Sequence, residues 1–166
     1  MYLPKRKPTR LKNYDYSSDG YYFITICSHN RKNLFSNIVG AIHESPENQL
    51  NKNGKIINCY IKQLASRFGL TVDKYVIMPN HIHLIIAIDE RAIRESPLQK
   101  RSFISKAIGY LKMNVSRDIH KNGYLYTVWQ RSFHDHIIRG ESDYLKIWNY
   151  IDTNPQKWKE DCFYTE

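Results

Sequence analysis

The stretch VIMPNHIHLIIAI, residues 76–88, decides the fold of this chain. Successive side chains of a strand point to opposite faces, so His81 and His83 are expected to share one face while Ile82 takes the other. The apolar run that follows, residues 84–88, is typical of a buried strand. Two imidazoles on one face of a rigid strand are half of a metal site. The alternative is a pair of ordinary polar residues near a strand end.

Working outward, Met78-Pro79-Asn80-His81 has proline at the second position of a turn, which predicts a hairpin between residues 70–78 and 81–88. A helical apolar stripe ending at Gly69 precedes this hairpin, and a second helix is expected to begin at Ser96-Pro97 and to end near Gly123. The other expected elements are strands at 21–27 and 132–138, a short strand at 38–43, a polar connection at 45–53, and a helix that Ser142 or Asp143 caps and Pro155 limits.

This order of elements, β-α-β-β-α-β with an additional C-terminal helix, predicts an α+β fold of the ferredoxin-like type. In that fold two helices pack on one face of an antiparallel sheet. Residues 1–19 are basic and then polar, and we expect them to form an N-terminal arm. Residues 20–166 are expected to form a single domain.

The composition indicates a polyanionic partner. The chain has 166 residues, a formal net charge of +9 and thirteen tyrosines. Aromatic rings among positive charges suit unpaired bases, which stack on the rings while phosphates meet lysine and arginine. An inert basic surface is the alternative. Three widely spaced cysteines favour a reducing, cytoplasmic compartment, and no apolar stretch predicts a signal peptide or a membrane span.

The predicted C-terminal helix carries a second pair of polar residues. Tyr150 and Asn154 are four positions apart, so they lie one above the other on the helix. If this helix packs near the sheet, the Asn154 amide oxygen can reach a metal that His81 and His83 hold. The alternative is an amphipathic core tyrosine followed by an asparagine that caps the helix before proline.

These motifs together resemble the HUH single-tyrosine transposases, and most closely the REP-associated tyrosine transposases. The resemblance covers about residues 10–157 and is carried by YYFITICSHNRKNLF, VIMPNHIHLII, VWQRSFHDHIIR and YIDTNP. It implies that Tyr150 is the nucleophile and that His81, His83 and Asn154 hold a divalent ion. Related insertion-sequence transposases often have glutamine at the position of Asn154, and the nearby Asp152 is a possible substitute ligand.

The resemblance implies cleavage and rejoining of single-stranded DNA beside a hairpin through a 5′-phosphotyrosine. Mixed nitrogen and oxygen ligands suit Mn²⁺ or Mg²⁺, although the residue types also admit Zn²⁺. The resemblance also implies a bacterial, cytoplasmic and nucleoid-associated protein, and it favours a monomer over a homodimer. A second His-x-His sequence, His134-Asp135-His136, lies in the predicted strand at 132–138. The expected DNA contacts are basic residues and one histidine of this second HxH motif: Lys5, Arg6, Lys7, Arg10, Arg31, Lys32, Arg131, His136 and Arg139.

Two other hypotheses remain open from the sequence. The first is a domesticated protein that binds hairpin DNA without cutting it, which the intact His81, His83 and Tyr150 disfavour. The second is a zinc or iron enzyme acting on a small molecule, which the net charge of +9 disfavours. A second metal site at His134 and His136 is improbable in so small a chain.

Overall fold

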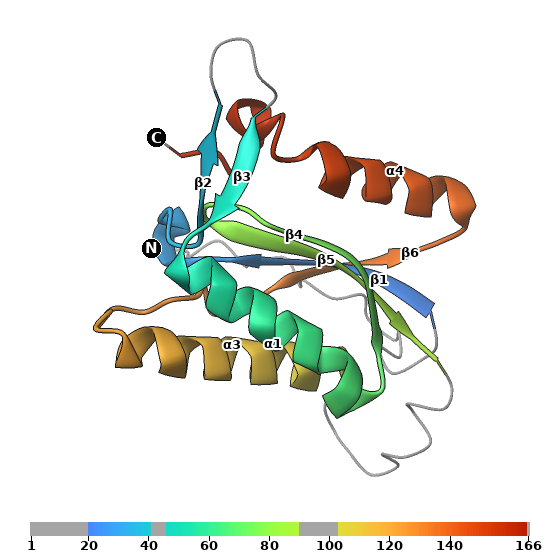
Figure 1. Ribbon diagram of the computed structural model, residues 1–166. Coiled ribbons are helices and arrows are strands. Elements are labelled where there is room, and N and C mark those ends of the chain that lie inside the picture. Colours follow the sequence, from blue (N-terminus) through green and yellow to red (C-terminus); the bar gives the residue numbers. More distant parts are fainter. Residues whose placement is uncertain (1–19, 41–45, 90–102, 166) are drawn as a thin grey trace, which may run out of the picture.

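The computed structural model describes residues 20–40, 46–89 and 103–165. Its elements, with short 3-10 helices written η, are β1 (Gly20–Cys27), η1 (His29–Arg31), β2 (Ser36–Val39), β3 (Glu47–Leu50), α1 (Lys52–Phe68), β4 (Thr71–Ile77), β5 (His81–Ile88), α3 (Phe103–Lys121), β6 (His134–Ile138), α4 (Glu141–Thr153) and η2 (Trp158–Glu160) (Figure 1). None of the helices in these ranges has both the length and the apolar character that crossing a membrane requires.

Four strands form an antiparallel sheet in the order β4-β5-β1-β6. Helices α1 and α3 cover one face, and α4 lies over the other (Figure 1). This arrangement confirms the predicted ferredoxin-like fold, including the hairpin between β4 and β5. In β5 the alternate residues Ile82, Leu84 and Ile86 enter the core beneath α1 and α3. The histidines of β5 therefore face α4.

Two local features fix where α1 begins and ends. The Asn51 side chain accepts hydrogen bonds from the backbone N–H groups of Asn53 and Gly54, at 2.9 and 3.1 Å, and so caps the helix. A Cβ atom at Gly54 would lie 2.2 Å from the carbonyl oxygen of Phe35, so only glycine fits there. Gly69 ends the helix at φ 64°, as the sequence predicted.

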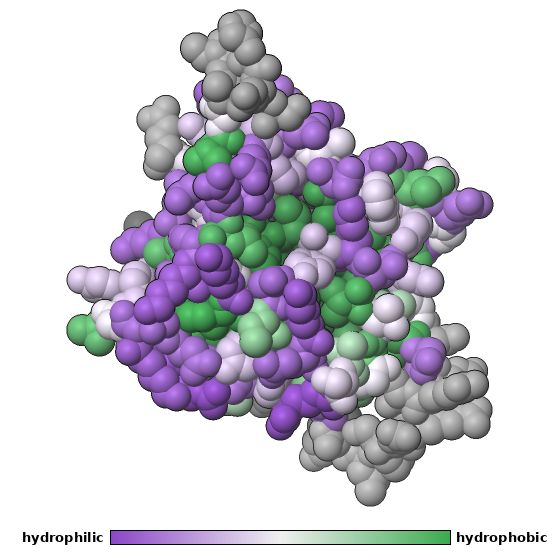
Figure 2. All heavy atoms as spheres, viewed as in Figure 1, coloured by the Kyte–Doolittle hydropathy of each residue, from purple (hydrophilic) through white to green (hydrophobic). Residues whose placement is uncertain are grey.

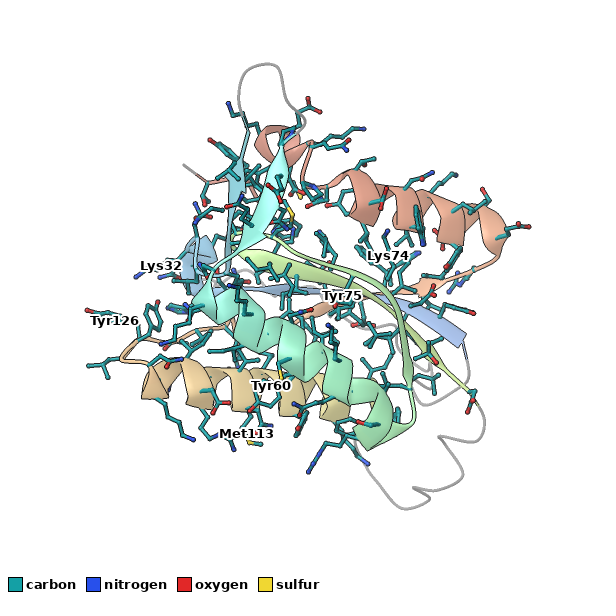
Figure 3. All side chains as sticks on the ribbon, viewed as in Figure 1. Lys32, Tyr60, Lys74, Tyr75, Met113 and Tyr126 are labelled. Carbon is teal, nitrogen blue, oxygen red and sulfur yellow. The ribbon has the colours of Figure 1, made fainter. Side chains whose placement is uncertain are left out.

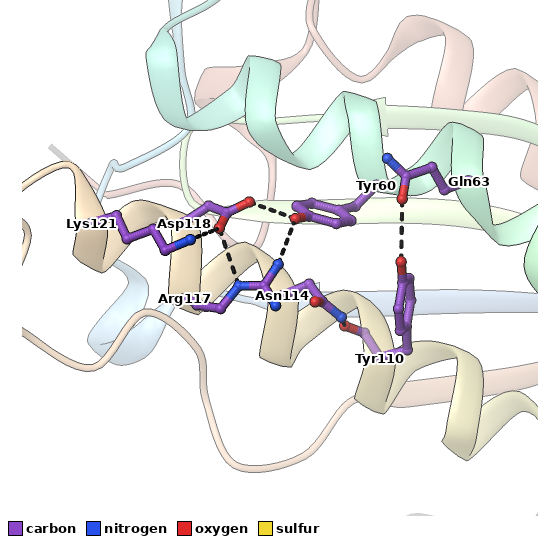
Figure 4. A network of polar contacts seen from close by, with 7 residues as sticks. All are labelled: Tyr60, Gln63, Tyr110, Asn114, Arg117, Asp118 and Lys121. Carbon is purple, nitrogen blue, oxygen red and sulfur yellow. Dashed lines mark hydrogen bonds and ion pairs between the residues drawn. The ribbon is translucent and has the colours of Figure 1, made fainter.

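A polar network links α1 to α3 on the outer side of the helical layer (Figure 4). Tyr60 of α1 donates to Asp118 of α3 at 2.5 Å, and Arg117 donates to both of them. Farther along the two helices Tyr110 donates to Gln63 at 3.2 Å. Part of the positive charge of α3, at Arg117, therefore joins the two helices. Hydrophilic residues cover these helices in Figure 2, and apolar residues gather near the middle of that face.

Two details of the sequence prediction need correction. The segment expected as a polar connection contains β3, which pairs with β2 in a separate two-stranded ribbon. The helix α4 begins at Glu141 after Gly140, so neither Ser142 nor Asp143 is its N-cap. Asp143 instead lies in the first turn, where its carboxylate accepts from the backbone N–H of Arg139. The helix start expected at Ser96-Pro97 falls outside the described residues.

Candidate active site

Strand β5 places the histidine pair against β1 and beneath α4. His81 is 0% exposed and His83 is 1% exposed, and their ring centroids lie 4.5 Å apart. Within the β1–β5 ladder, Cys27 pairs with His81 and Thr25 pairs with His83. The predicted sharing of one face is therefore confirmed, and both histidines are buried although they stand at the start of β5.

Asn80 determines which ring nitrogen of the neutral His81 side chain carries the proton. The Asn80 amide nitrogen donates to the carbonyl oxygens of Arg31 and Phe163 at 3.2 and 2.8 Å. The amide oxygen of Asn80 therefore faces His81, and it accepts a hydrogen bond from Nδ1 at 2.9 Å. The lone pair of the neutral ring then lies on Nε2, which is buried and has no hydrogen-bond partner. Burial lowers the pKa of His81 to about 4, so the ring is neutral at pH 7.

His83 is held in the same way from the neighbouring strand. Its Nδ1 lies 2.9 Å from the hydroxyl oxygen of Thr25, and its ring stacks on Phe23 with centroids 5.1 Å apart. Burial, and then the nearby His81, lower the pKa of His83 well below its ordinary value. Both rings are thus oriented by a hydrogen bond through Nδ1, the arrangement that metal-binding histidines use.

Helix α4 brings Tyr150 and Asn154 to the histidines. The Tyr150 hydroxyl oxygen lies 3.2 Å from His83 Nε2, and 39% of the side chain is exposed. Asn154, one turn later, is 2% exposed. Its amide nitrogen donates to Asp161 at 2.7 Å, whereas its oxygen is buried without a hydrogen-bond partner. Burial, and then Asp161, raise the pKa of Tyr150 far above its ordinary value, so the resting phenol keeps its proton.

Lys74 of β4 attaches α4 to the sheet. Its ammonium group lies 2.5 Å from an Asp152 oxygen and 3.7 Å from the centre of the Trp148 ring (Figure 3). Asp152 therefore points to Lys74 and is absent from the group of residues around the histidines. Its suggested role as a substitute metal ligand is not supported by this geometry.

Asp161 is a site residue that the sequence analysis missed. It follows η2, and its carboxylate accepts from Tyr150 at 3.2 Å and from the backbone N–H of Phe163 at 2.7 Å. Its ligand atoms and those of His81 and His83 all lie within 4.8 Å of one another, close enough to hold one ion. In the sequence this aspartate stands in no motif and on no periodic face, so no signal could have identified it.

A cavity of about 130 Å³ leads from this group of residues to the surface. Its lining residues belong to α4 and to the segment after it: Tyr150, Thr153, Asn154, Lys157, Glu160 and Asp161. Lys157 and Glu160 also line a larger cleft of about 670 Å³ beside the β2–β3 ribbon. The phenol can therefore be approached from solvent while the two imidazoles remain enclosed.

The residues expected to contact DNA are scattered over the chain, and only some of them lie within the described residues. Lys5, Arg6, Lys7 and Arg10 lie outside the described residues. Arg31 turns toward the site, where it donates to the Cys162 carbonyl at 2.9 Å and lies over the Phe163 ring. Lys32 lies over the ring of Tyr126, which is 68% exposed (Figure 3). Arg131 and Arg139 are exposed.

The second HxH motif lies on β6. His134 and His136 share the sheet face of His83, because they pair with Thr25 and Phe23 of β1. His136 forms a 2.8 Å contact with Asp143. Among the described residues neither histidine belongs to a group that could hold a metal ion.

Buried histidine nitrogens beside a tyrosine, on a ferredoxin-like sheet, define a candidate site for metal-assisted attack by a phenol. The chain belongs to the family described as "Transposase IS200 like", whose sequence profile matches residues 16–154. This match agrees with the resemblance drawn from the motifs.

Two proteins and one solved structure are similar to this chain. An uncharacterized protein of Haemophilus influenzae is 38% identical, with 97% of this chain and 94% of the relative covered. A second protein of that organism, named as a candidate REP-associated tyrosine transposase, is 26% identical over 89% and 77% of the two chains. A solved REP-associated tyrosine transposase, bound to a REP hairpin, shares the fold with a TM-score of 0.64 at 20% identity, over 90% of this chain and 73% of that one.

Proposed function

We propose that this chain is a metal-dependent transposase that cleaves and rejoins single-stranded DNA beside a hairpin. The observation that carries the proposal is the 3.2 Å distance between the Tyr150 hydroxyl and His83 Nε2, inside a group of neutral nitrogen and oxygen donors. The family supports the reaction class, and the related enzyme solved with a REP hairpin supports the choice of DNA.

The donor set fits a divalent cation. His81 Nε2 and Asn154 Oδ1 are both buried without hydrogen-bond partners, a costly arrangement that a bound ion would relieve. With His83 Nε2 they supply two nitrogens and one oxygen, a set that Mn²⁺ or Mg²⁺ accepts when phosphate and water complete the shell. Such an ion would polarise the scissile phosphate and offset the negative charge that grows on its oxygens.

The chain's own residues perform the bond exchange. The Tyr150 oxygen attacks the scissile phosphorus, a bond from this oxygen to phosphorus forms, and the bond from phosphorus to the 3′ oxygen breaks. The 3′ oxygen leaves as a hydroxyl after taking up a proton, and the 5′ phosphate stays on Tyr150. A second 3′ hydroxyl can reverse the step, because the phosphotyrosine conserves one phosphodiester bond.

Asp161 is the proposed acceptor of the Tyr150 proton. The phenol lies 3.2 Å from both His83 Nε2 and Asp161 Oδ2. Metal ligation would use the lone pair of His83 Nε2, which leaves Asp161 as the acceptor. Both Asp161 oxygens are engaged, by Phe163 N–H and by the Asn154 amide, whereas the Asn154 oxygen is free to ligate. We therefore assign ligation to Asn154 and proton transfer to Asp161.

Asp161→Asn separates these two roles. Without the carboxylate, the rate of adduct formation should fall by about 10²–10⁴-fold, the usual contribution of a general base. The affinity for Mn²⁺, measured by titration calorimetry, should stay near its wild-type value. If Asp161→Asn loses metal affinity as severely as Asn154→Ala, Asp161 is a ligand and the assignment is wrong.

We propose a monomer in which Tyr150 serves the histidines of its own chain. The proposal is supported by the 3.2 Å distance between the Tyr150 hydroxyl and His83 Nε2 within one chain. Mixing the His83→Ala protein with the Tyr150→Phe protein should therefore restore no DNA cleavage, because neither chain holds a complete site. As a control, wild-type protein is mixed with each variant separately, which checks that neither variant inhibits DNA cleavage. Cleavage above the sum of the separate variants would show that one chain's tyrosine serves another chain's metal site.

The proposed DNA contacts are the basic residues expected from the sequence. Arg31 lies beside the site, through its contacts with Cys162 and Phe163, and Lys32 is next to it in the chain. Arg131 precedes β6, His136 belongs to it and Arg139 follows it, and β6 lies on the other side of β1 from β5. The four basic residues of the arm complete the set. We also propose that the protein acts in the bacterial cytoplasm, at the nucleoid.

The test is covalent attachment to DNA. Hairpin oligonucleotides copied from palindromic repeats beside the gene are incubated with the full chain and Mn²⁺ or Mg²⁺, and labels on the two ends identify the attached fragment. The proposal expects a protein–DNA adduct that retains the 3′ fragment and releases a free 3′ hydroxyl. Binding of the same hairpins without any adduct would instead favour the domesticated binding protein.

A further inference from the structure

An aromatic pocket lies at the N-terminal end of α4, whereas the candidate active site lies at the C-terminal end of the same helix. It measures about 300 Å³ and is lined by Tyr21, Ile138, Gly140, Glu141 and Tyr144. Tyr21 of β1 is 45% exposed, and its ring meets the ring of Tyr144 edge-on, with centroids 5.5 Å apart. Nothing in the reaction described above uses this pocket.

A hydrogen bond and strand pairing hold the walls of the pocket. The hydroxyl of Tyr144 donates to Asp73 of β4, which fixes the orientation of the ring. Ile138 pairs with Tyr21 across the β1–β6 ladder. Gly140 turns the chain from β6 into α4 at φ 85° and adds no side chain to the wall. A preformed pocket of this kind loses little conformational entropy when it binds a flat ring.

The pocket is continuous with the catalytic tyrosine through a row of rings. Tyr21 and Phe23 lie two positions apart on the same face of β1, about 7 Å by strand geometry. Phe23 in turn meets Tyr150 edge-on at 6.1 Å and stacks on His83. On α4, Tyr144 and Tyr150 are six residues apart, about 9 Å along the helix axis. A DNA strand whose phosphate is at Tyr150 can therefore reach the pocket within a few nucleotides.

The chemistry of the lining selects a base over a phosphate. Glu141 is the one ionised group among the five lining residues, and its carboxylate repels phosphate. Tyrosine rings, by contrast, stack on any nucleobase without reading its sequence. The edge of a base also offers N–H groups that a carboxylate accepts.

We propose that this pocket, defined by Tyr21, Ile138, Gly140, Glu141 and Tyr144, holds one unpaired nucleobase of the DNA strand next to the scissile phosphate. The inference rests on the proposed function and deepens it, because the pocket would fix the position of the strand relative to Tyr150. Stacking on Tyr21 supplies the affinity, and the fixed Tyr144 ring closes the other side.

The experiment combines abasic DNA with variants of Tyr21. Affinity is measured in the Tyr150→Phe background for the hairpin oligonucleotide of the adduct assay, with one base at a time removed near the cleavage position. We expect a single position, about one to three nucleotides from the scissile phosphate, where losing the base weakens binding about 5- to 100-fold. In Tyr21→Ala that position should lose its effect, because the intact and abasic strands then bind equally weakly.

Three controls make the result specific. Tyr21→Phe keeps the ring and should retain the abasic penalty, and so should Leu145→Ala, which alters an exposed residue of α4 outside the pocket. The third control leaves the pocket unchanged and alters the DNA instead. An oligonucleotide with the fluorescent base 2-aminopurine at the sensitive position should lose fluorescence when the protein binds it.

A penalty that persists in Tyr21→Ala, or no penalty at any position, would overturn the pocket proposal. If wild-type protein still forms the covalent adduct in that case, the proposed function stands without the pocket proposal. Absence of the adduct in wild type, with the abasic penalty intact, would reject the function and leave the base pocket.

Discussion

Replacing Tyr150 by phenylalanine should abolish covalent attachment to hairpin DNA while leaving DNA binding nearly unchanged. The change removes one oxygen atom, which is the proposed nucleophile, and keeps the ring that meets Phe23 and His83. Loss of a nucleophile that no neighbour replaces lowers the rate by a factor on the order of 10⁴ or more. The adduct is measured by denaturing electrophoresis, and binding is measured by fluorescence anisotropy.

The matched control is Tyr126→Phe. Tyr126 is 68% exposed, and its ring lies under Lys32, away from the histidines. Removing its hydroxyl should preserve both adduct formation and binding. Persistence of the adduct in Tyr150→Phe at more than a trace would mean that another residue attacks the DNA, and the assignment of α4 to catalysis would fail.

The second large effect is expected from the proposed metal site. His83→Ala removes a proposed ligand nitrogen, on a ring that Thr25 of β1 contacts. Changes to residues that merely orient a ligand already cost about 10- to 100-fold in metal affinity, so loss of the ligand itself should cost more than about 100-fold. DNA cleavage should disappear with it, and a chelator should have the same effect on wild-type protein until Mn²⁺ or Mg²⁺ is restored.

His134→Ala is the control for this prediction, because it alters a histidine of the other HxH motif on the same sheet face. It should bind Mn²⁺ as wild type does. Circular dichroism checks that His83→Ala is folded, since the change empties a buried position. Unchanged metal affinity in folded His83→Ala would show that the buried imidazoles are structural, and cleavage that survives chelation would remove the metal from the reaction.

The sequence predicts the centre of this site because strand and helix periodicity place its residues. Alternation along residues 76–88 puts His81 and His83 on one face, and the structure confirms it. Four-residue spacing puts Asn154 above Tyr150, and both reach the histidine side of the sheet. These are local rules of backbone geometry, so they hold without knowledge of the remaining chain.

The features that the sequence could not predict depend on contacts between distant segments. Asp161 comes after the last regular helix, and only the folded chain brings it to the phenol eleven positions earlier. Asp152 has the right charge for a ligand, but Lys74 of β4 binds it instead. The strand β3 was missed because ENQL has no apolar alternation, and its pairing with β2 defines it.

The basic arm and the second helix start illustrate a different limit. The residues concerned lie outside the described ranges, so their predicted roles stay predictions. The pocket at Tyr21 lies within the described residues, but the sequence predicts only that YYFITIC forms a strand, not which side chains its rings contact. Only the position of α4 over β1 reveals that Tyr21 meets Tyr144.

The central claim is that the Tyr150 oxygen forms a bond to DNA phosphorus beside the histidine pair. Mass spectrometry of the trapped adduct, after digestion of protein and DNA, tests it most directly. We predict a nucleotide mass on the peptide that contains Tyr150, with fragmentation that assigns it to this tyrosine and a requirement for the divalent ion. A nucleotide on any other residue, or none in protein that cleaves the hairpin, would contradict the account.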